Sequence, residues 1–246
     1  MEFIFRNLAN ILTLSNMFCG FLGILNALYG DLVSASVCVL LASVFDFLDG
    51  AVARRFKLYS EIGKQLDSFA DLVSFGTLPA LILHVMLIKS HHDWVYFAHV
   101  GGLPLVSLLP FALTACAAIR LGKFNLSTDQ GVLFRGLPTP AVALFIAALP
   151  LIMRFNLYLL GYKSIYPDNV ILNPWFILSL VFIFSWLMCS DIRIMSLKFH
   201  NFSWNDNKAR YLLFALSVIL FVFLLFLALP LSIILLIAFS FIFKHK

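Results

Sequence analysis

Residues 32–53 read LVSASVCVLLASVFDFLDGAVA, an almost uninterrupted apolar run that is long enough to cross a lipid bilayer as a helix. Comparable runs lie near 11–29, 70–88, 94–119, 137–153, 170–189 and 211–243. The last run is too long for one helix across a hydrocarbon core of about 30 Å, and Pro230 divides it into 211–229 and 231–243. The sequence therefore predicts an all-α, polytopic membrane helix bundle with about eight transmembrane helices.

Composition restricts the class of protein further. Of the 246 residues, 62% are hydrophobic and only 12% are charged, whereas soluble domains carry about 25% charged residues. A water-soluble globule of this length cannot bury so much apolar surface in one core. The same figures argue against a disordered chain, a disulfide scaffold and a nucleic-acid-binding domain. We therefore expect the lipid bilayer as a partner and no nucleic acid.

Basic residues are distributed unevenly along the chain. With the N-terminus on the cytoplasmic side, 14 of the 17 lysines and arginines fall in cytoplasmic segments, which is the imbalance that the positive-inside rule describes. An undivided last run would place Lys244 and Lys246 on the opposite side. We therefore expect eight spans in the cytoplasmic (inner) membrane, with the N- and C-termini both cytoplasmic.

Four of the twelve acidic residues lie at the predicted cytoplasmic ends of two consecutive spans, namely Asp46, Asp49, Asp67 and Asp71. The members of each pair are three or four residues apart, so each pair occupies one face of its helix. A hairpin folded at 54–62 directs all four carboxylates into one cleft. Buried like charges need a counter-cation, and an all-oxygen ligand set suits Mg²⁺ or Mn²⁺, with Ca²⁺ as a further occupant.

Other residues near these acids suit a phosphate-containing ligand. Small residues that leave room for its approach are Gly50, Ala53 and Gly63. Basic residues that can bind phosphate oxygens are Arg54, Lys64 and Arg120. Together with the acids, they predict a metal-dependent phosphoryl-type reaction at the cytoplasmic surface of the membrane.

The first span carries a stripe of small and polar residues, made of Thr13, Asn16, Gly20 and Gly23. One interpretation is that this stripe faces a bound nucleotide. The other is that it is a close packing face, with Asn16 hydrogen-bonded across it to a neighbouring helix. The sequence leaves both interpretations open.

The segment that holds the four acids, residues 46–71, reads DFLDGAVARRFKLYSEIGKQLDSFAD. It resembles the signature of the CDP-alcohol phosphotransferases, Asp-x2-Asp-Gly-x2-Ala-Arg-x8-Gly-x3-Asp-x3-Asp, and matches all eight specified positions. The resemblance implies that an acceptor hydroxyl displaces CMP from a CDP-linked group with the help of a divalent metal. It also implies a homodimer.

The same resemblance implies roles for individual residues. Metal ligands would be Asp46, Asp49, Asp67 and Asp71, and Asp71 would also be the general base. Gly50 and Ala53 would leave room for the nucleotide, and Arg54 would bind its phosphates.

Three further stretches resemble the phosphatidylserine synthase branch of that family: NILTLSNMFCGFLGI at 10–24, AIRLGKFN at 118–125 and FRGLPTPA at 134–141. This resemblance implies CDP-diacylglycerol and L-serine as substrates, and phosphatidylserine and CMP as products. Because serine carries a carboxylate, Arg120 is the first candidate to bind it, with Asn125 nearby. For Lys123 and Arg135 we favour a role in membrane orientation alone.

Two alternatives remain open at this point. In the first alternative, the chemistry is the same but the acceptor is glycerol-3-phosphate, inositol or inositol phosphate, or the donor is an archaeal ether lipid. A cation transporter also places carboxylates in a membrane, although it usually does so near the midplane within repeated halves. We expect one integral membrane catalytic domain over 1–246, with an interfacial segment at 1–10, a catalytic core at 11–160 and additional C-terminal spans at 170–246.

Overall fold

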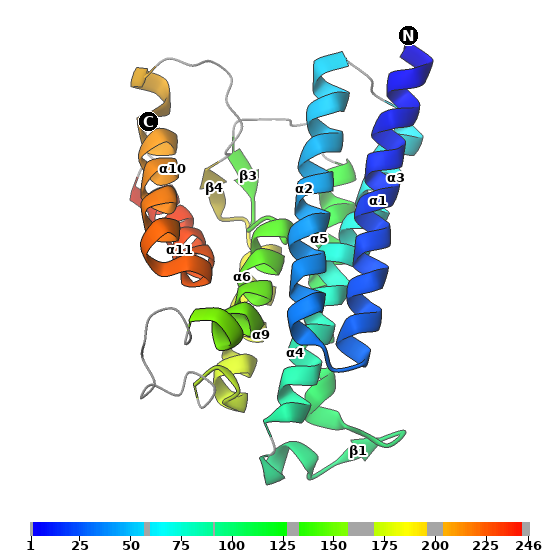
Figure 1. The fold of residues 1–246 in the computed structure, drawn as a ribbon, viewed down its shortest axis with the longest axis vertical. Helices are drawn as coiled ribbons and strands as arrows, with labels where there is room; N and C mark the ends of the chain where they lie inside the picture. Colours follow the sequence, from blue (N-terminus) through cyan, green and yellow to red (C-terminus); the bar gives the residue numbers. More distant parts are fainter. Residues whose placement is uncertain are drawn as a thin grey trace.

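The computed structural model describes residues 2–56, 60–90, 92–126, 133–156, 170–195 and 204–242, and most of them are helical (Figure 1). The α-helices are α1 (Glu2–Leu28), α2 (Leu32–Phe56), α3 (Glu61–Asp71), α4 (Leu78–Lys89), α5 (Phe111–Leu126), α6 (Thr139–Leu151), α9 (Pro174–Cys189), α10 (Trp204–Leu224) and α11 (Ala228–Ile242). Wider π-helical turns extend two of them, at Leu72–Thr77 after α3 and at Ile152–Asn156 after α6. Short 3-10 turns lie at Asp93–Tyr96, Leu105–Leu108 and Leu225–Leu227.

Several of these helices are long and apolar enough to cross a membrane. Among the described residues, the candidates are Leu8–Leu28, Leu32–Phe56, Glu61–Lys89, Leu105–Leu126 and Arg210–Phe241, and the shorter apolar helices are Thr139–Phe155 and Pro174–Cys189. The prediction of a helical, polytopic membrane protein is therefore confirmed. The count of eight spans and the cytoplasmic position of both termini stay predictions.

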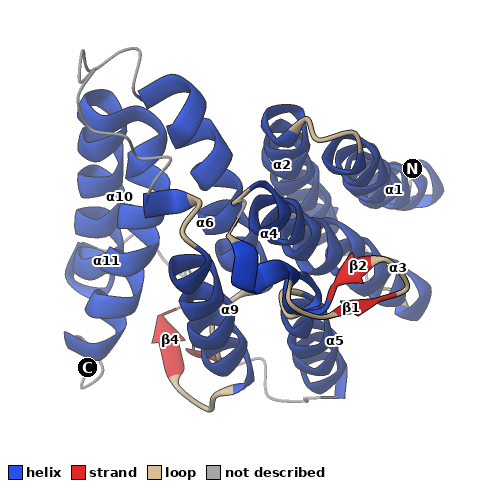
Figure 2. Cartoon of the chain, turned by 90° about the horizontal axis from the view of Figure 1, so that it is seen from below, coloured by secondary structure: helices blue, strands red, loops and turns tan. Residues whose placement is uncertain are grey.

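The two C-terminal helices divide at a different residue from the one predicted. Helix α10 ends at Leu224, and Leu225 has a positive φ of 50° in the turn that precedes α11. Pro230 lies within the first turn of α11, where a proline is tolerated because the missing N–H has no partner in the helix. The helices α10 and α11 lie side by side (Figures 1 and 2).

The prediction of a span beginning at residue 94 is wrong, because residues 93–104 do not form an α-helix. Strands β1 (His99–Val100) and β2 (Leu103–Pro104) pair there in a short antiparallel hairpin. Gly101 and Gly102 form its two-residue turn with φ of 57° and 82°, which is the conformation that tight hairpins require. The span begins at Leu105 instead.

A second small sheet modifies the all-α prediction. Strands β3 (Leu133–Arg135) and β4 (Arg193–Met195) pair antiparallel, and so join the segment before α6 to the segment after α9. Gly136 follows β3 with a φ of 73°, and a Cβ there would lie 2.5 Å from the carbonyl oxygen of Met188. Only glycine fits this close approach.

Helix α4 is the centre of the bundle and is enclosed by α1, α2, α5, α6 and α9 (Figure 2). Its largest side chains are fully buried, among them Leu78, Ile82, Leu83, Met86 and Leu87. By contrast, the outward faces of the surrounding helices expose large apolar side chains, such as Phe18, Phe47 and Phe182. So many exposed apolar side chains fit contact with lipid rather than with water.

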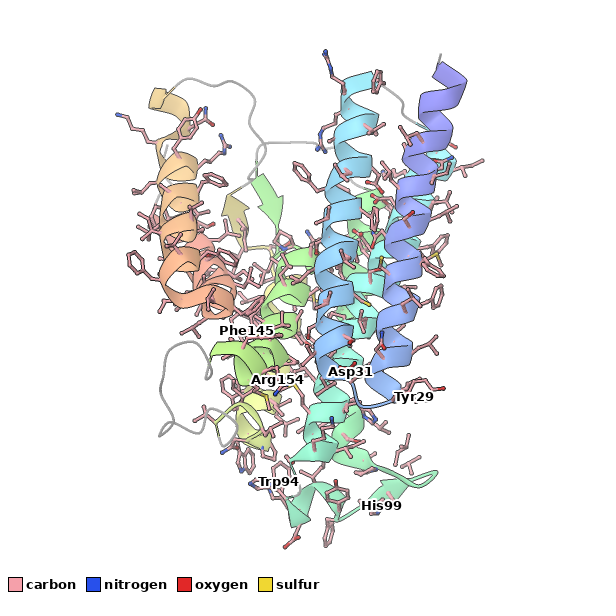
Figure 3. The ribbon with its side chains drawn as sticks, in the orientation of Figure 1. Tyr29, Asp31, Trp94, His99, Phe145 and Arg154 are labelled. Atoms are coloured by element: carbon pink, nitrogen blue, oxygen red, sulfur yellow. The ribbon has the colours of Figure 1, made fainter. Side chains whose placement is uncertain are left out.

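Residues at one end of the bundle fix the connection between α1 and α2 (Figure 3). Asp31 accepts a hydrogen bond from the backbone N–H of Ser34 at 3.0 Å and so caps the start of α2. Hydrogen bonds from the Ser34 side chain and backbone hold the pKa of the Asp31 carboxyl below its ordinary value. Lys89, at the end of α4, donates to the carbonyl oxygen of Gly30 at 2.6 Å.

Helix α1 packs very closely against the π-helical turn after α3 and against the start of α4. A Cβ on Gly20 would lie 2.5 Å from Ser74 Oγ, and one on Gly23 would lie 2.3 Å from Leu78 Cδ2. Small residues allow such contact between membrane helices. The packing interpretation of the stripe on the first span therefore holds for its two glycines.

Residues 2–10 continue α1 as part of the same helix. Their expected position along the membrane interface stays a prediction, as do the limits of the catalytic core.

Candidate active site

The candidate site lies where α2 ends and α3 begins. Ser60 caps α3, and its hydroxyl oxygen accepts a hydrogen bond from the backbone N–H of Gly63 at 3.0 Å. A Cβ on Gly63 would lie 2.8 Å from Ser60 Oγ and 3.5 Å from Asn10 Oδ1. Gly63 therefore has a structural role at the start of the helix, beside α1, in addition to the ligand role expected from the sequence.

Three of the four predicted aspartates converge. One carboxylate oxygen from each of Asp46, Asp49 and Asp67 lies within 4.8 Å of the other two. Asp49 is buried and the other two are half-buried. Spacing along α2 places Asp46 and Asp49 on one face, and the return of the chain through α3 brings Asp67 to them. We call these three residues the aspartate triad.

The aspartate triad fits a divalent metal ion. Three carboxylates this close repel one another, and partial burial strengthens the repulsion, so they need a positive charge between them. The triad offers only oxygen atoms, which Mg²⁺, Mn²⁺ and Ca²⁺ prefer. Among the described residues, the group brought together here contains no histidine or cysteine.

Asp71 is not among the residues whose carboxylate oxygens lie within 4.8 Å of one another. It is buried, and its Oδ1 has no hydrogen-bond partner among the described residues. Its carboxylate interacts electrostatically with Asp46 and Asp67, and with opposite sign with Arg120 on α5. The structure thus gathers three of the four predicted ligands, and metal ligation by Asp71 stays a prediction.

A π-helical turn, Leu72–Thr77, begins directly after Asp71. Turns of this kind occur frequently at functional sites. Within it, Ser74 donates a hydrogen bond to the carbonyl oxygen of Asn16 at 2.9 Å. This contact joins the end of α3 to α1.

Of the polar members of the stripe on α1, Thr13 contacts the aspartate triad, and Asn16 is buried. The Thr13 hydroxyl donates to Asp49 Oδ2 at 2.6 Å. Asn16 is 0% exposed, and neither its Oδ1 nor its Nδ2 has a hydrogen-bond partner among the described residues. A buried amide without partners is unfavourable, and the side-chain bond that the packing interpretation expects is not among those that the structure describes.

Arg54 lies along the face of α2 that carries the acids. A Cβ on Gly50 would lie 3.1 Å from Arg54 Nη1, so glycine leaves space for the arginine to fold back over it. Arg54 attracts both Asp46 and Asp49. Ala53, on the same turn of the helix, is half-buried.

Lys64 and Asn125 bind each other across α3 and α5. The Lys64 ammonium donates to the carbonyl oxygen of Asn125 at 2.7 Å, and Asn125 Nδ2 donates to Ser68 Oγ at 2.8 Å. We call this set the α3–α5 clamp. It gives both residues a structural contact that the sequence did not predict, and their proposed contacts with phosphate and serine stay predictions.

Arg120 is the basic residue next to Asp71. Its Nη1 lies 3.4 Å from the hydroxyl oxygen of Thr139 at the start of α6, and its Nε has no hydrogen-bond partner among the described residues. Thr139 and Ser74 were missed by the sequence analysis. Thr139 lies within the FRGLPTPA stretch, which was the available signal, whereas nothing local to Ser74 indicates its contact.

Comparisons with known proteins place these residues in one matched region. Residues 6–186 match the CDP-alcohol phosphatidyltransferase family. The chain is 32% identical over 131 residues to the CDP-diacylglycerol–serine O-phosphatidyltransferase of Bacillus subtilis, covering 53% of this chain and 67% of that protein.

Two archaeal proteins are similar as well. The archaetidylserine synthase of Methanothermobacter thermautotrophicus is 35% identical over 163 residues, covering 65% of this chain and 61% of that one. The CDP-diacylglycerol–serine O-phosphatidyltransferase of Methanocaldococcus jannaschii is 35% identical over 140 residues, covering 57% and 61%. The chain therefore spans less than two thirds of the length of these two relatives.

Proposed function

Because this chain belongs to the CDP-alcohol phosphatidyltransferase family, we propose that it transfers the phosphatidyl group of CDP-diacylglycerol to the hydroxyl of L-serine. The products are phosphatidylserine and CMP. The observation that carries the proposal is the aspartate triad next to the Asp71–Arg120 pair. The names of the similar proteins, which specify serine or archaetidylserine, support the choice of acceptor.

Donor binding follows from the residues of α2 and α3. Asp46, Asp49 and Asp67 would hold Mg²⁺ or Mn²⁺, which would supply positive charge next to the pyrophosphate and the leaving CMP. Arg54, folded over Gly50, binds phosphate oxygens. Ala53 and Asn16 complete the nucleotide side of the site.

Asp71 and Arg120 act on the acceptor. Arg120, which is half-buried and lies next to Thr139 at the start of α6, binds the serine carboxylate. Asp71 takes the proton of the serine hydroxyl as its oxygen attacks the phosphorus that carries the diacylglycerol. The bond from that phosphorus to the oxygen of CMP breaks, and CMP leaves with the electron pair.

The membrane position of the protein completes this proposal. The acyl chains of CDP-diacylglycerol stay in the bilayer, while serine and CMP exchange with the cytoplasm. We place the site at the cytoplasmic face of the inner membrane and the catalytic core at 11–160, with 170–246 as additional spans. The protein acts as a homodimer in this proposal.

The direct test measures CMP release by the purified protein from CDP-diacylglycerol with each candidate alcohol. We expect release with L-serine and little with glycerol-3-phosphate, inositol or inositol phosphate. An ether-linked CDP lipid in parallel reports the donor preference. Release with another alcohol alone would refute serine as the acceptor, and no release with any alcohol would refute the transferase reaction and leave cation transport to be tested by flux.

Replacing Arg120 with lysine is expected to raise the KM for serine by about 10–100-fold, because hydrogen bonds to charged groups contribute about 1.5–3 kcal/mol and lysine cannot bind a carboxylate bidentately. The KM for CDP-diacylglycerol should change little. Lys123→Ala, which removes an exposed cation from the same helix, is the control. Equal effects of both substitutions on the serine KM would contradict the assignment.

A further inference from the structure

We propose that Thr13 is a positioning residue of the metal site and does not contact the nucleotide. Its hydroxyl holds Oδ2 of Asp49 and so fixes the orientation of a carboxylate that would bind the divalent ion. This inference rests on the proposed function, because it needs the aspartate triad to bind an ion. It replaces the nucleotide role that the sequence indicated for Thr13.

The contact itself is short and enclosed. Thr13 Oγ1 and Asp49 Oδ2 are 2.6 Å apart, and each residue is only 6% exposed. A hydroxyl bonded to a carboxylate at such a distance forms a charge-assisted hydrogen bond, which is stronger than one between neutral groups. The bond therefore restricts the rotation of the Asp49 side chain.

The single proton of Thr13 has two acceptors within reach. The second is the carbonyl oxygen of Ala9 on the preceding turn of α1, at 3.1 Å. A hydroxyl donates only one hydrogen bond. Because the carboxylate is both closer and charged, Thr13 donates that hydrogen bond to Asp49 rather than to Ala9. With its proton engaged and its surface covered, Thr13 has no donor left for a nucleotide phosphate.

Helix α1 makes two such contacts, three residues apart. Thr13 bonds Asp49 on α2, and the carbonyl oxygen of Asn16 accepts from Ser74, three residues after Asp71. At Gly20, α1 packs closely against the same π-helical turn. Helix α1 therefore contacts both sides of the site and fixes the position of Asp49 on α2 relative to α3, which carries Asp67 and Asp71.

Partners that orient a metal ligand without touching the metal affect affinity, and their loss typically weakens metal binding or activity by about 10–100-fold. We therefore expect Thr13→Val, which keeps the shape and removes the hydroxyl, to weaken Mn²⁺ binding by about this factor. Thr13→Ser keeps the hydroxyl and should stay within about threefold of wild type, since the hydrogen bond to Asp49 is retained.

The matched control is Ser15→Ala on the same helix. The Ser15 hydroxyl donates only to the carbonyl oxygen of Ile11, at 2.8 Å, among the contacts that the structure describes. Mn²⁺ affinity is measured by electron paramagnetic resonance on the purified protein without substrates, alongside thermal unfolding without metal. Saturating Mn²⁺ should restore most of the kcat of Thr13→Val, because the role of Thr13 is in holding the ion.

The outcomes separate this inference from the proposed function. Wild-type Mn²⁺ affinity in Thr13→Val, or a loss of thermal stability without a change in that affinity, would overturn it. So would the absence of Mn²⁺ binding by the unaltered protein. If the unaltered protein binds Mn²⁺ and Thr13→Val weakens it, but serine releases no CMP, the positioning role stands and the proposed acceptor fails.

Discussion

Asp71→Asn is expected to lower serine-dependent CMP release by about 10²–10⁴-fold, the usual contribution of a general base. Asparagine has nearly the same shape as aspartate but cannot accept the proton of the serine hydroxyl. The carboxylate at this position is buried next to Arg120, and its Oδ1 accepts no hydrogen bond from any described residue. The measurement is single-turnover CMP release at saturating serine and CDP-diacylglycerol.

Two controls make the result specific to Asp71. Binding of CDP-diacylglycerol to Asp71→Asn, measured by equilibrium titration, should stay close to that of the unaltered protein. Asp31→Asn alters a carboxyl at the opposite end of α2, where asparagine also caps a helix, and should leave turnover unchanged. Near-normal turnover in Asp71→Asn would remove the general-base assignment.

Removing divalent ions should abolish turnover, and adding Mg²⁺ or Mn²⁺ should restore it. Without an ion, the aspartate triad presents three negative charges to a negatively charged pyrophosphate, so the donor is repelled. The measurement is CMP release after treatment with a chelator and during titration with each metal. The titration also reports which ion the site prefers.

Ion binding should also be visible without substrate. A ligand that binds only the folded state stabilises it, by about 2.7 kcal/mol at a hundredfold excess over its Kd. Mn²⁺ should therefore raise the unfolding temperature of the unaltered protein and raise it less in Asp49→Asn. Turnover that persists at full rate in excess chelator would rule out the metal role.

The convergence of Asp46, Asp49 and Asp67 could be predicted because it depends on short-range geometry. Helical spacing sets the first two on one face, and the hairpin brings the third to them. The same rule groups Asp67 with Asp71, yet Asp71 lies outside the group whose carboxylate oxygens are within 4.8 Å of one another, although it interacts electrostatically with all three members. Its partner Arg120 lies on a helix distant in sequence, so spacing within the hairpin carries no information about that pairing.

Other contacts between residues distant in the chain could not be predicted from the sequence either. The sequence left open whether the stripe with Thr13 and Asn16 faces a nucleotide or a neighbouring helix, because the partner of Thr13 is 36 residues away. Lys64 was predicted from its charge to bind phosphate, and the structure shows it bonded to a backbone carbonyl on α5. A charged side chain near a site can equally well cap a helix end.

Hydropathy also failed at one span boundary. The window from 94 is apolar, and Phe97, Val100 and Leu103 contribute to that value although they lie in or beside a hairpin. Gly101 and Gly102 were the signal for a turn. Average hydrophobicity does not distinguish an apolar hairpin from a helix, whereas backbone conformation does.

The enclosure of α4 by protein has a consequence for biogenesis. Of the helices that enclose α4, α1 and α2 precede it in the chain, whereas α5, α6 and α9 follow it, so a newly synthesised α4 lacks part of its protein cover. His84 on α4 obtains its partner, the carbonyl oxygen of Ser107 at 2.6 Å, only when the segment leading into α5 has been made. The enclosure of α4 is therefore completed only late in synthesis, and a chain that ends before Ser107 lacks the partner of the buried His84 imidazole.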